Sequence, residues 1–227
     1  MTAAFANLLT RNKTSLSTAF RLKRFQLFKA VLDTLPLPAT VLDVGGTASI
    51  WEYGGYEDSA DVSITIMNLE NSQIRATNMI SLVGDARSMP QFQNQQFDIV
   101  FSNSVIEHVG DFADQKQMAM EVVRVGKNYI VQTPNYFFPF EPHFLFPCFQ
   151  FLPFWLKLWL TRNFNLGHRP KAADQEQAIV NINSIRLLTR KEMAELFPDA
   201  IIYEEKFFGL TKSFAAIGGT AATIWLK

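Results

Sequence analysis

Asp43 has the clearest chemical setting in the sequence, because it lies where an apolar run meets two glycines. The segment reads Ala39-Thr40-Val41-Leu42-Asp43-Val44-Gly45-Gly46-Thr47. The apolar β-branched residues predict a buried strand, and the glycines allow a sharp turn and a close approach to a ligand. No lysine follows, as a nucleoside-triphosphate loop requires, and the G-x-G-x-x-G pattern of dinucleotide sites is absent. A carboxylate here would repel a pyrophosphate, so the segment favours a cofactor that carries an ammonium and a sulfonium.

This segment resembles the first motif of class I S-adenosylmethionine-dependent methyltransferases, D-x-G-x-G-x-G. Asp43 and Gly45 match the motif. Thr47 and Ser49 replace its later glycines, and Gly46 adds one between them.

A second segment, Gln96–Val109, carries the stronger resemblance. It places Phe97-Asp98 before an apolar strand and Glu107-His108 at the start of the next helix. This arrangement is similar to the fourth-strand motif of the small-molecule, type 11-like branch of the same family. The resemblance implies the Rossmann-like methyltransferase fold and S-adenosylmethionine as the cofactor.

The resemblance also implies which residues hold that cofactor. In the family, an acidic residue after the second strand accepts hydrogen bonds from the ribose hydroxyls. Asn68 stands at that position, with Glu70 two residues further on. An aspartate after the third strand receives the adenine amino group, and Asp85 matches it. The full predicted set is Asp43, Gly45, Gly46, Asn68, Glu70, Asp85, Ala86, Ser102, Asn103 and Ser104.

Three residues are candidate acid–base catalysts: His108, Glu141 and His143. An imidazole titrates near neutral pH, and burial among apolar residues would shift the pKa of either group in the pair Glu141 and His143. Each residue also has a structural alternative. His108 would then bond to backbone at a helix start, and Glu141 and His143 would pair with each other or with Arg162 or Arg169. No metal site is predicted.

An aromatic-rich insert follows the fifth predicted strand and covers residues 134–187. Its stretch 144–160 carries one charge, Lys157, but contains Pro147 and Pro153. The stretch is also shorter than the ~20 residues needed to cross a bilayer. Two interpretations stay open: a lid over the acceptor site, or a peripheral membrane contact through residues 144–160. Both place recognition of the methyl acceptor in the insert.

Composition limits the other functions. The 227 residues include 21 basic and 21 acidic side chains, so no overall charge attracts nucleic acid, and no nucleic-acid partner is expected. One cysteine, Cys148, excludes an intrachain disulfide. The first residues lack the pattern of a secretion signal, so a cytoplasmic location, with possible peripheral membrane contact, is expected.

The predicted fold is α/β: a doubly wound, mostly parallel seven-stranded sheet. A helical segment is expected over residues 1–36, and a methyltransferase domain over 37–227. Methyl transfer to a small or lipid-like acceptor is the predicted function. The alternative is a catalytically silent binding module that keeps the cofactor fold, with or without association with a membrane. A nicotinamide dehydrogenase is disfavoured by the missing glycine pattern and by a predicted closing strand pair.

Overall fold

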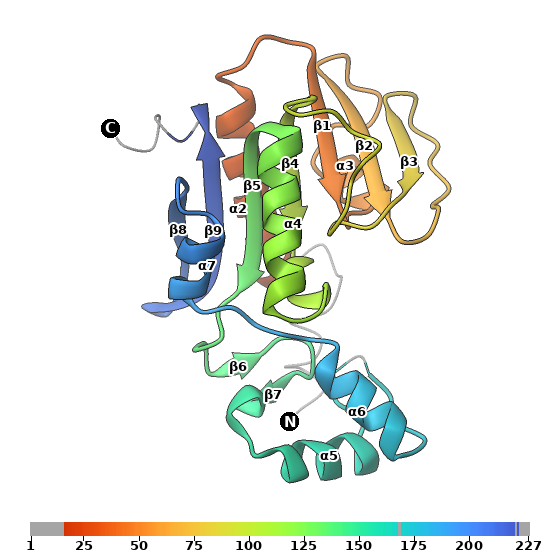
Figure 1. The fold of residues 1–227 in the computed structure, drawn as a ribbon, viewed down its shortest axis with the longest axis vertical. Coiled ribbons are helices and arrows are strands. Elements are labelled where there is room, and N and C mark those ends of the chain that lie inside the picture. The colour runs from red at the N-terminus through yellow and green to blue at the C-terminus, as the bar shows by residue number, and fades with distance from the viewer. Residues whose placement is uncertain (1–15, 168, 221, 223–227) are drawn as a thin grey trace.

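A seven-stranded sheet forms the centre of the molecule (Figure 1). The structure is a computed structural model that describes residues 16–167, 169–220 and 222. The sheet order is β3-β2-β1-β4-β5-β9-β8, with β9 antiparallel to both of its neighbours. This order confirms the predicted doubly wound fold with a closing strand pair. The strands are β1 (Ala39–Val44), β2 (Val62–Asn68), β3 (Met79–Val83), β4 (Phe97–Asn103), β5 (Gly126–Pro134), β8 (Ile201–Phe207) and β9 (Leu210–Gly219).

Helices cover both faces of the sheet, as the near-continuous apolar strands require. On one face lie α2 (Leu16–Leu32) and the short α3 (Ala48–Tyr53). On the other lie α4 (Phe112–Val125) and α7 (Arg190–Leu196). Residues 1–15 of the predicted N-terminal helical segment lie outside the described residues.

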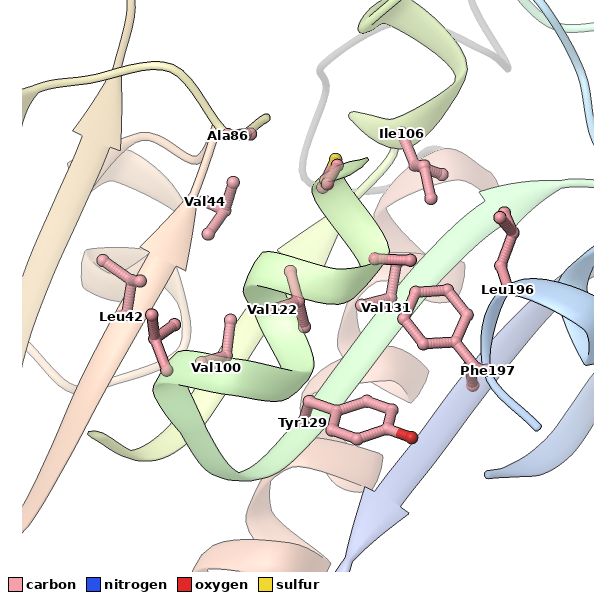
Figure 2. Close-up of a cluster of buried hydrophobic side chains, with 14 of the residues drawn as sticks. Leu42, Val44, Ala86, Val100, Ile106, Val122, Tyr129, Val131, Leu196 and Phe197 are labelled. Carbon is pink, nitrogen blue, oxygen red and sulfur yellow. The ribbon is translucent and has the colours of Figure 1, made fainter. Parts of the chain in front are cut away.

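The larger buried cluster lies between the sheet and α4 (Figure 2). Val122 of α4 is fully buried in the same cluster as Val100 of β4 and Val131 of β5. Phe197, directly after α7, packs its ring against Tyr129 of β5 at a centroid distance of 5.5 Å. These contacts fix α4 and α7 over the central strands, whose carboxyl ends carry the predicted site.

Capping signals set where the two helices on this face begin. Asp111 accepts hydrogen bonds from the backbone N–H groups of Ala113 and Asp114 at the start of α4. Thr189 and Glu192 form a capping box at the start of α7, the sequence pattern typical of a helix start. The first residue of each of these helices is therefore set by side chains close to it in the sequence.

Between β5 and α7 the chain leaves the sheet and forms a small subdomain beneath the carboxyl ends of β4 and β5 (Figure 1). Its own core includes Phe144, Phe149, Leu160 and Leu166. An isolated β-bridge between Asn135 and Leu188 joins the two ends of the chain segment that forms this subdomain. Its elements are β6 (Phe140–Glu141), β7 (Phe146–Pro147), the 3₁₀ turn η2 (Phe149–Phe151), α5 (Phe154–Asn163) and α6 (Gln175–Asn183).

Within the described part of the chain, every helix is too short or too polar to traverse a lipid bilayer.

Candidate functional site

Asp43 is buried at the carboxyl end of β1, beneath the glycine turn. Its Oδ2 accepts a 2.6 Å hydrogen bond from the indole Nε1 of Trp51, in α3. Its Oδ1 is also buried but finds no hydrogen-bond partner among the described residues. Gly46 packs against the carboxyl group so closely that an added Cβ would lie 1.7 Å from Oδ2. Gly45 adopts a φ of +75°, which favours glycine.

Burial decides the ionisation of this carboxyl. It raises the pKa of Asp43 to about 7, and the hydrogen bond from Trp51 opposes part of that rise. A cation that contacts Oδ1 would restore the charged form. The glycine turn and this carboxyl therefore fit a ligand with a positive charge.

The end of β4, the neighbouring strand, offers a second buried acceptor. The side-chain Oδ1 of Asn103 has no hydrogen-bond partner among the described residues. The other two predicted residues here are used by the protein itself. Ser102 donates to the carbonyl of Val44, and Ser104 donates to the side chain of Gln132. Asn103 is thus the residue of this group that is free to meet a ligand.

The residues predicted to bind ribose and adenine lie along the same edge but are partly occupied. Asn68 donates from Nδ2 to the carbonyl of Gly46 at 2.7 Å, which braces the glycine turn. Glu70 is exposed after β2. Asp85 forms an ion pair with Arg87 at 2.6 Å, and this contact lowers the pKa of Asp85. Sequence reasoning missed Arg87, although its position two residues after Asp85 permits the contact.

The three acid–base candidates come together around a residue that was not among them, Glu107. His143 donates from Nδ1 to Glu141 at 2.6 Å, and its Nε2 lies 3.7 Å from Oε1 of Glu107. The rings of His108 and His143 meet edge to face at 4.8 Å. Nδ1 of His108 lies 3.2 Å from the carbonyl of Ser184. The predicted Glu141–His143 pair and the predicted backbone contact of His108 both exist.

Glu107 is fully buried in the 3₁₀ turn η1 (Ile106–His108). Its Oε2 accepts a hydrogen bond from Thr133 at 2.9 Å, while its Oε1 has no hydrogen-bond partner among the described residues. Burial raises the pKa of Glu107, and nearby His143 opposes the rise. Burial also lowers the pKa of His108, and His143 adds to that effect. The only sequence signal for Glu107 is its place before His108, after an apolar run.

A pocket of about 390 Å³ lies between the insert and the start of α7. One side is aromatic, with Tyr136, Phe144 and Phe149, and Glu141 connects it to the histidine cluster. Burial lowers the pKa of the lining residue Lys157. The remaining lining residues are Gln150, Ile182, Ile185, Arg186, Leu187, Thr189 and Glu192.

Comparison with known proteins agrees with this geometry. Residues 42–129 match a protein family described as a methyltransferase domain. Two uncharacterized proteins of Mycobacterium tuberculosis, from strains CDC 1551 / Oshkosh and H37Rv, are each 27% identical over 128 residues. The match covers 52% of this chain and 43% of each relative, so it spans less than half of their length.

Two solved methyltransferase structures are similar to this chain. The CurJ carbon methyltransferase superposes with a TM-score of 0.55 and 11% identity, over 88% of this chain and 54% of that chain. A SAM-dependent methyltransferase from Aquifex aeolicus has a TM-score of 0.49 and 13% identity, over 96% and 97% of the two chains.

Residues 42–129 of the chain therefore match a methyltransferase domain, as the sequence resemblance predicted. The predicted enzyme class, with S-adenosylmethionine as its cofactor, agrees with this match.

Proposed function

We propose that this protein transfers a methyl group from S-adenosylmethionine to a small or lipid-like acceptor held under the insert. Two buried oxygens that have no donor among the residues the structure describes, Oδ1 of Asp43 and Oδ1 of Asn103, carry the cofactor half of this proposal. They belong to β1 and β4, which pair in parallel, so both lie at the same edge of the sheet. An ammonium group has three donors and would satisfy them.

When bound, S-adenosylmethionine supplies a methyl group already activated on a sulfonium. The task left to the protein is mainly to position the acceptor. Glu107 follows the end of β4 and is hydrogen-bonded to Thr133, the penultimate residue of β5. Glu141, which contacts His143 of the same cluster, lines the pocket under the insert. An acceptor with an apolar body and a polar nucleophilic end would match the aromatic lining on one side and the cluster of Glu107, His108 and His143 on the other.

A lipid-like acceptor is favoured by the surface of α5. Trp155 and Trp159 are 68% and 51% exposed, and their spacing of four places them on one face of the helix. Phe154 is also exposed, and Arg162 lies in the last turn. Exposed tryptophans beside a basic residue suit the boundary between lipid headgroups and acyl chains. We therefore include peripheral membrane contact through α5 in the proposal.

Calorimetric titration with S-adenosylhomocysteine tests the cofactor half. We expect saturable binding to the wild type and at least tenfold weaker binding to Asp43→Asn, which replaces an acceptor oxygen and the charge. Asp33→Asn changes an exposed carboxylate on another part of the surface and should leave the affinity unchanged.

Two results would contradict the proposal: no binding of S-adenosylhomocysteine to the wild type, or equal affinities for the wild type and Asp43→Asn. The first would favour the silent-module alternative. A screen for transfer of labelled methyl groups to a library of small and lipid acceptors then identifies the acceptor.

A further inference from the structure

We propose that Glu107, His108 and His143 form a binding site for one divalent transition-metal ion at the acceptor end of the methyltransferase site. Each residue offers one ligand atom, and no two of these atoms are more than 4.8 Å apart. Two imidazoles and one carboxylate form a ligand set that suits zinc and ferrous iron, with positions left open for other ligands.

The two histidines are already oriented as metal ligands. Nδ1 of His143 contacts the Glu141 carboxylate, and Nδ1 of His108 contacts the Ser184 carbonyl. Both oxygens can only accept, so in each neutral ring Nδ1 carries the proton and Nε2 keeps its lone pair. Metal-binding histidines usually have this arrangement, with the other ring nitrogen held by a carboxylate or carbonyl.

Glu141 is itself held in place, which makes the support of His143 rigid. Its Oε2 accepts hydrogen bonds from the backbone N–H groups of His143 and Phe144, at 2.8 and 2.6 Å. The residue is only 2% exposed. Because both of its oxygens are engaged, Glu141 acts as a positioning residue for the imidazole rather than as a ligand.

Glu107 supplies an independent observation. It is fully buried, yet its Oε1 has no hydrogen-bond partner within the described residues. A buried carboxylate oxygen without a donor is costly, and a metal ion is one of the partners that remove the cost. The Nε2 atom of His143 lies 3.7 Å from this oxygen. Bonds of about 2.0–2.2 Å to a shared ion would place two ligand atoms at about this separation.

Only His108 would need to move. Its side chain is on the exposed side of the cluster, so a small rotation would shorten its distances to the other two ligands. Because this side of the cluster is accessible, the ion would keep coordination positions that the three protein ligands do not fill. This part of the inference rests on the proposed function: the open positions would take an oxygen of the methyl acceptor, such as a hydroxyl. Metal binding itself does not depend on methyl transfer.

The test uses the untagged 227-residue chain, which is treated with a chelator and then titrated with Zn²⁺ by calorimetry and with Co²⁺ by visible absorption. We expect one equivalent of Zn²⁺ to bind, with a Co²⁺ absorption spectrum typical of nitrogen and oxygen ligands. Glu107→Gln and His143→Ala should each weaken binding at least 100-fold. Glu141→Gln should weaken it about 10-fold to 100-fold, since it changes only the support of His143.

Glu195→Gln, an exposed carboxylate on α7, is the matched control and should bind Zn²⁺ like the wild type. Binding of S-adenosylhomocysteine to each variant shows that its fold is intact. A wild type that binds S-adenosylhomocysteine but no Zn²⁺ would overturn the metal site and leave the proposed function standing. Undiminished Zn²⁺ binding by Glu107→Gln would also overturn it.

Discussion

At the scale of single residues, the site depends on carboxyl groups that the fold removes from water. Asp43 and Glu107 are both buried, and each keeps one oxygen without a partner among the described residues. Such oxygens reduce the stability of the folded chain and are kept where a ligand compensates for them. Both lie at the carboxyl edge of the sheet, where open α/β folds bind ligands.

Asp43 gives a pH prediction whose sign follows from burial. Its folded-state pKa of about 7 lies above the ordinary value of 3.8. Its contribution to stability is therefore complete below about pH 4 and is lost as the pH rises through 7. Asp43→Asn removes this dependence. The difference in unfolding free energy, variant minus wild type, should therefore be up to ~3 kcal/mol larger at pH 8 than at pH 5.

Urea denaturation of the wild type, Asp43→Asn and Asp33→Asn at both pH values measures this gain. The Asp33→Asn control should show the same pH dependence as the wild type. A constant difference between Asp43→Asn and the wild type at the two pH values would show that Asp43 does not titrate in this range.

Sequence reasoning identified some of these residues and missed others, for physical reasons. Asp43 was predictable because a strand, a carboxylate and two glycines are adjacent in the chain. The Glu141–His143 pair was predictable because two polar residues in an apolar segment tend to meet. Glu107 was missed as a site residue, because only the 3₁₀ turn directs its side chain inward to Thr133.

At the scale of elements, β8 and α2 are joined by a partly buried group of charges. Glu205 of β8 is 3% exposed and lies 3.5 Å from Arg24 of α2. It also lies 3.4 Å from Lys212 and accepts a hydrogen bond from Ser213 at 2.7 Å, both in β9. Burial lowers the pKa of Lys212 to about 8. Three elements thus meet at one carboxylate.

Two adjacent glutamates in β8 give a matched pair of substitutions. Glu205→Gln leaves two partly buried cations facing a neutral amide and should lower the unfolding free energy by ~3 kcal/mol. Glu204 pairs with Arg190 at a more exposed position, so Glu204→Gln should cost less than ~1 kcal/mol. Urea denaturation at pH 7 measures both, and equal losses would contradict the role assigned to burial.

The predictability of the elements follows from their length and pattern. The strands and α4 were predictable from apolar runs and helical spacing, and α7 from its capping box. The crossover after β1 contains the short helix α3 (Ala48–Tyr53), which the sequence pattern does not indicate. Six residues carry too little periodicity to indicate a helix. The importance of Trp51 in that helix, as the donor to Asp43, appears only in three dimensions.

At the scale of the whole molecule, we propose that the sheet binds the cofactor and that the insert binds the methyl acceptor. The order and direction of the sheet could be predicted because they follow from the sequence of strands and from the resemblance at its motifs. The internal arrangement of the insert could not, since an aromatic segment with few charges has no single polar face. Its outer surface leads to a prediction about membranes.

The double variant Trp155→Ser/Trp159→Ser should reduce binding to anionic phospholipid vesicles at least tenfold, because it removes the exposed indoles of α5. Co-sedimentation with vesicles measures the bound fraction. Met120→Ser, which removes an exposed apolar side chain on α4, is the control and should bind like the wild type. Wild-type protein that stays in the supernatant would exclude the membrane contact and leave the lid interpretation of the insert.

The position of β9 has a consequence for synthesis on the ribosome. β9 pairs with β5 from Asn128 to Pro134, yet it begins only at Leu210, after the insert, α7 and β8 have been made. A nascent chain that has emerged only as far as β8 therefore presents an unpaired, apolar edge of β5 to the cytosol. Such an edge can pair with other chains. We expect this translation intermediate to be a preferred client of chaperones that act at the ribosomal exit.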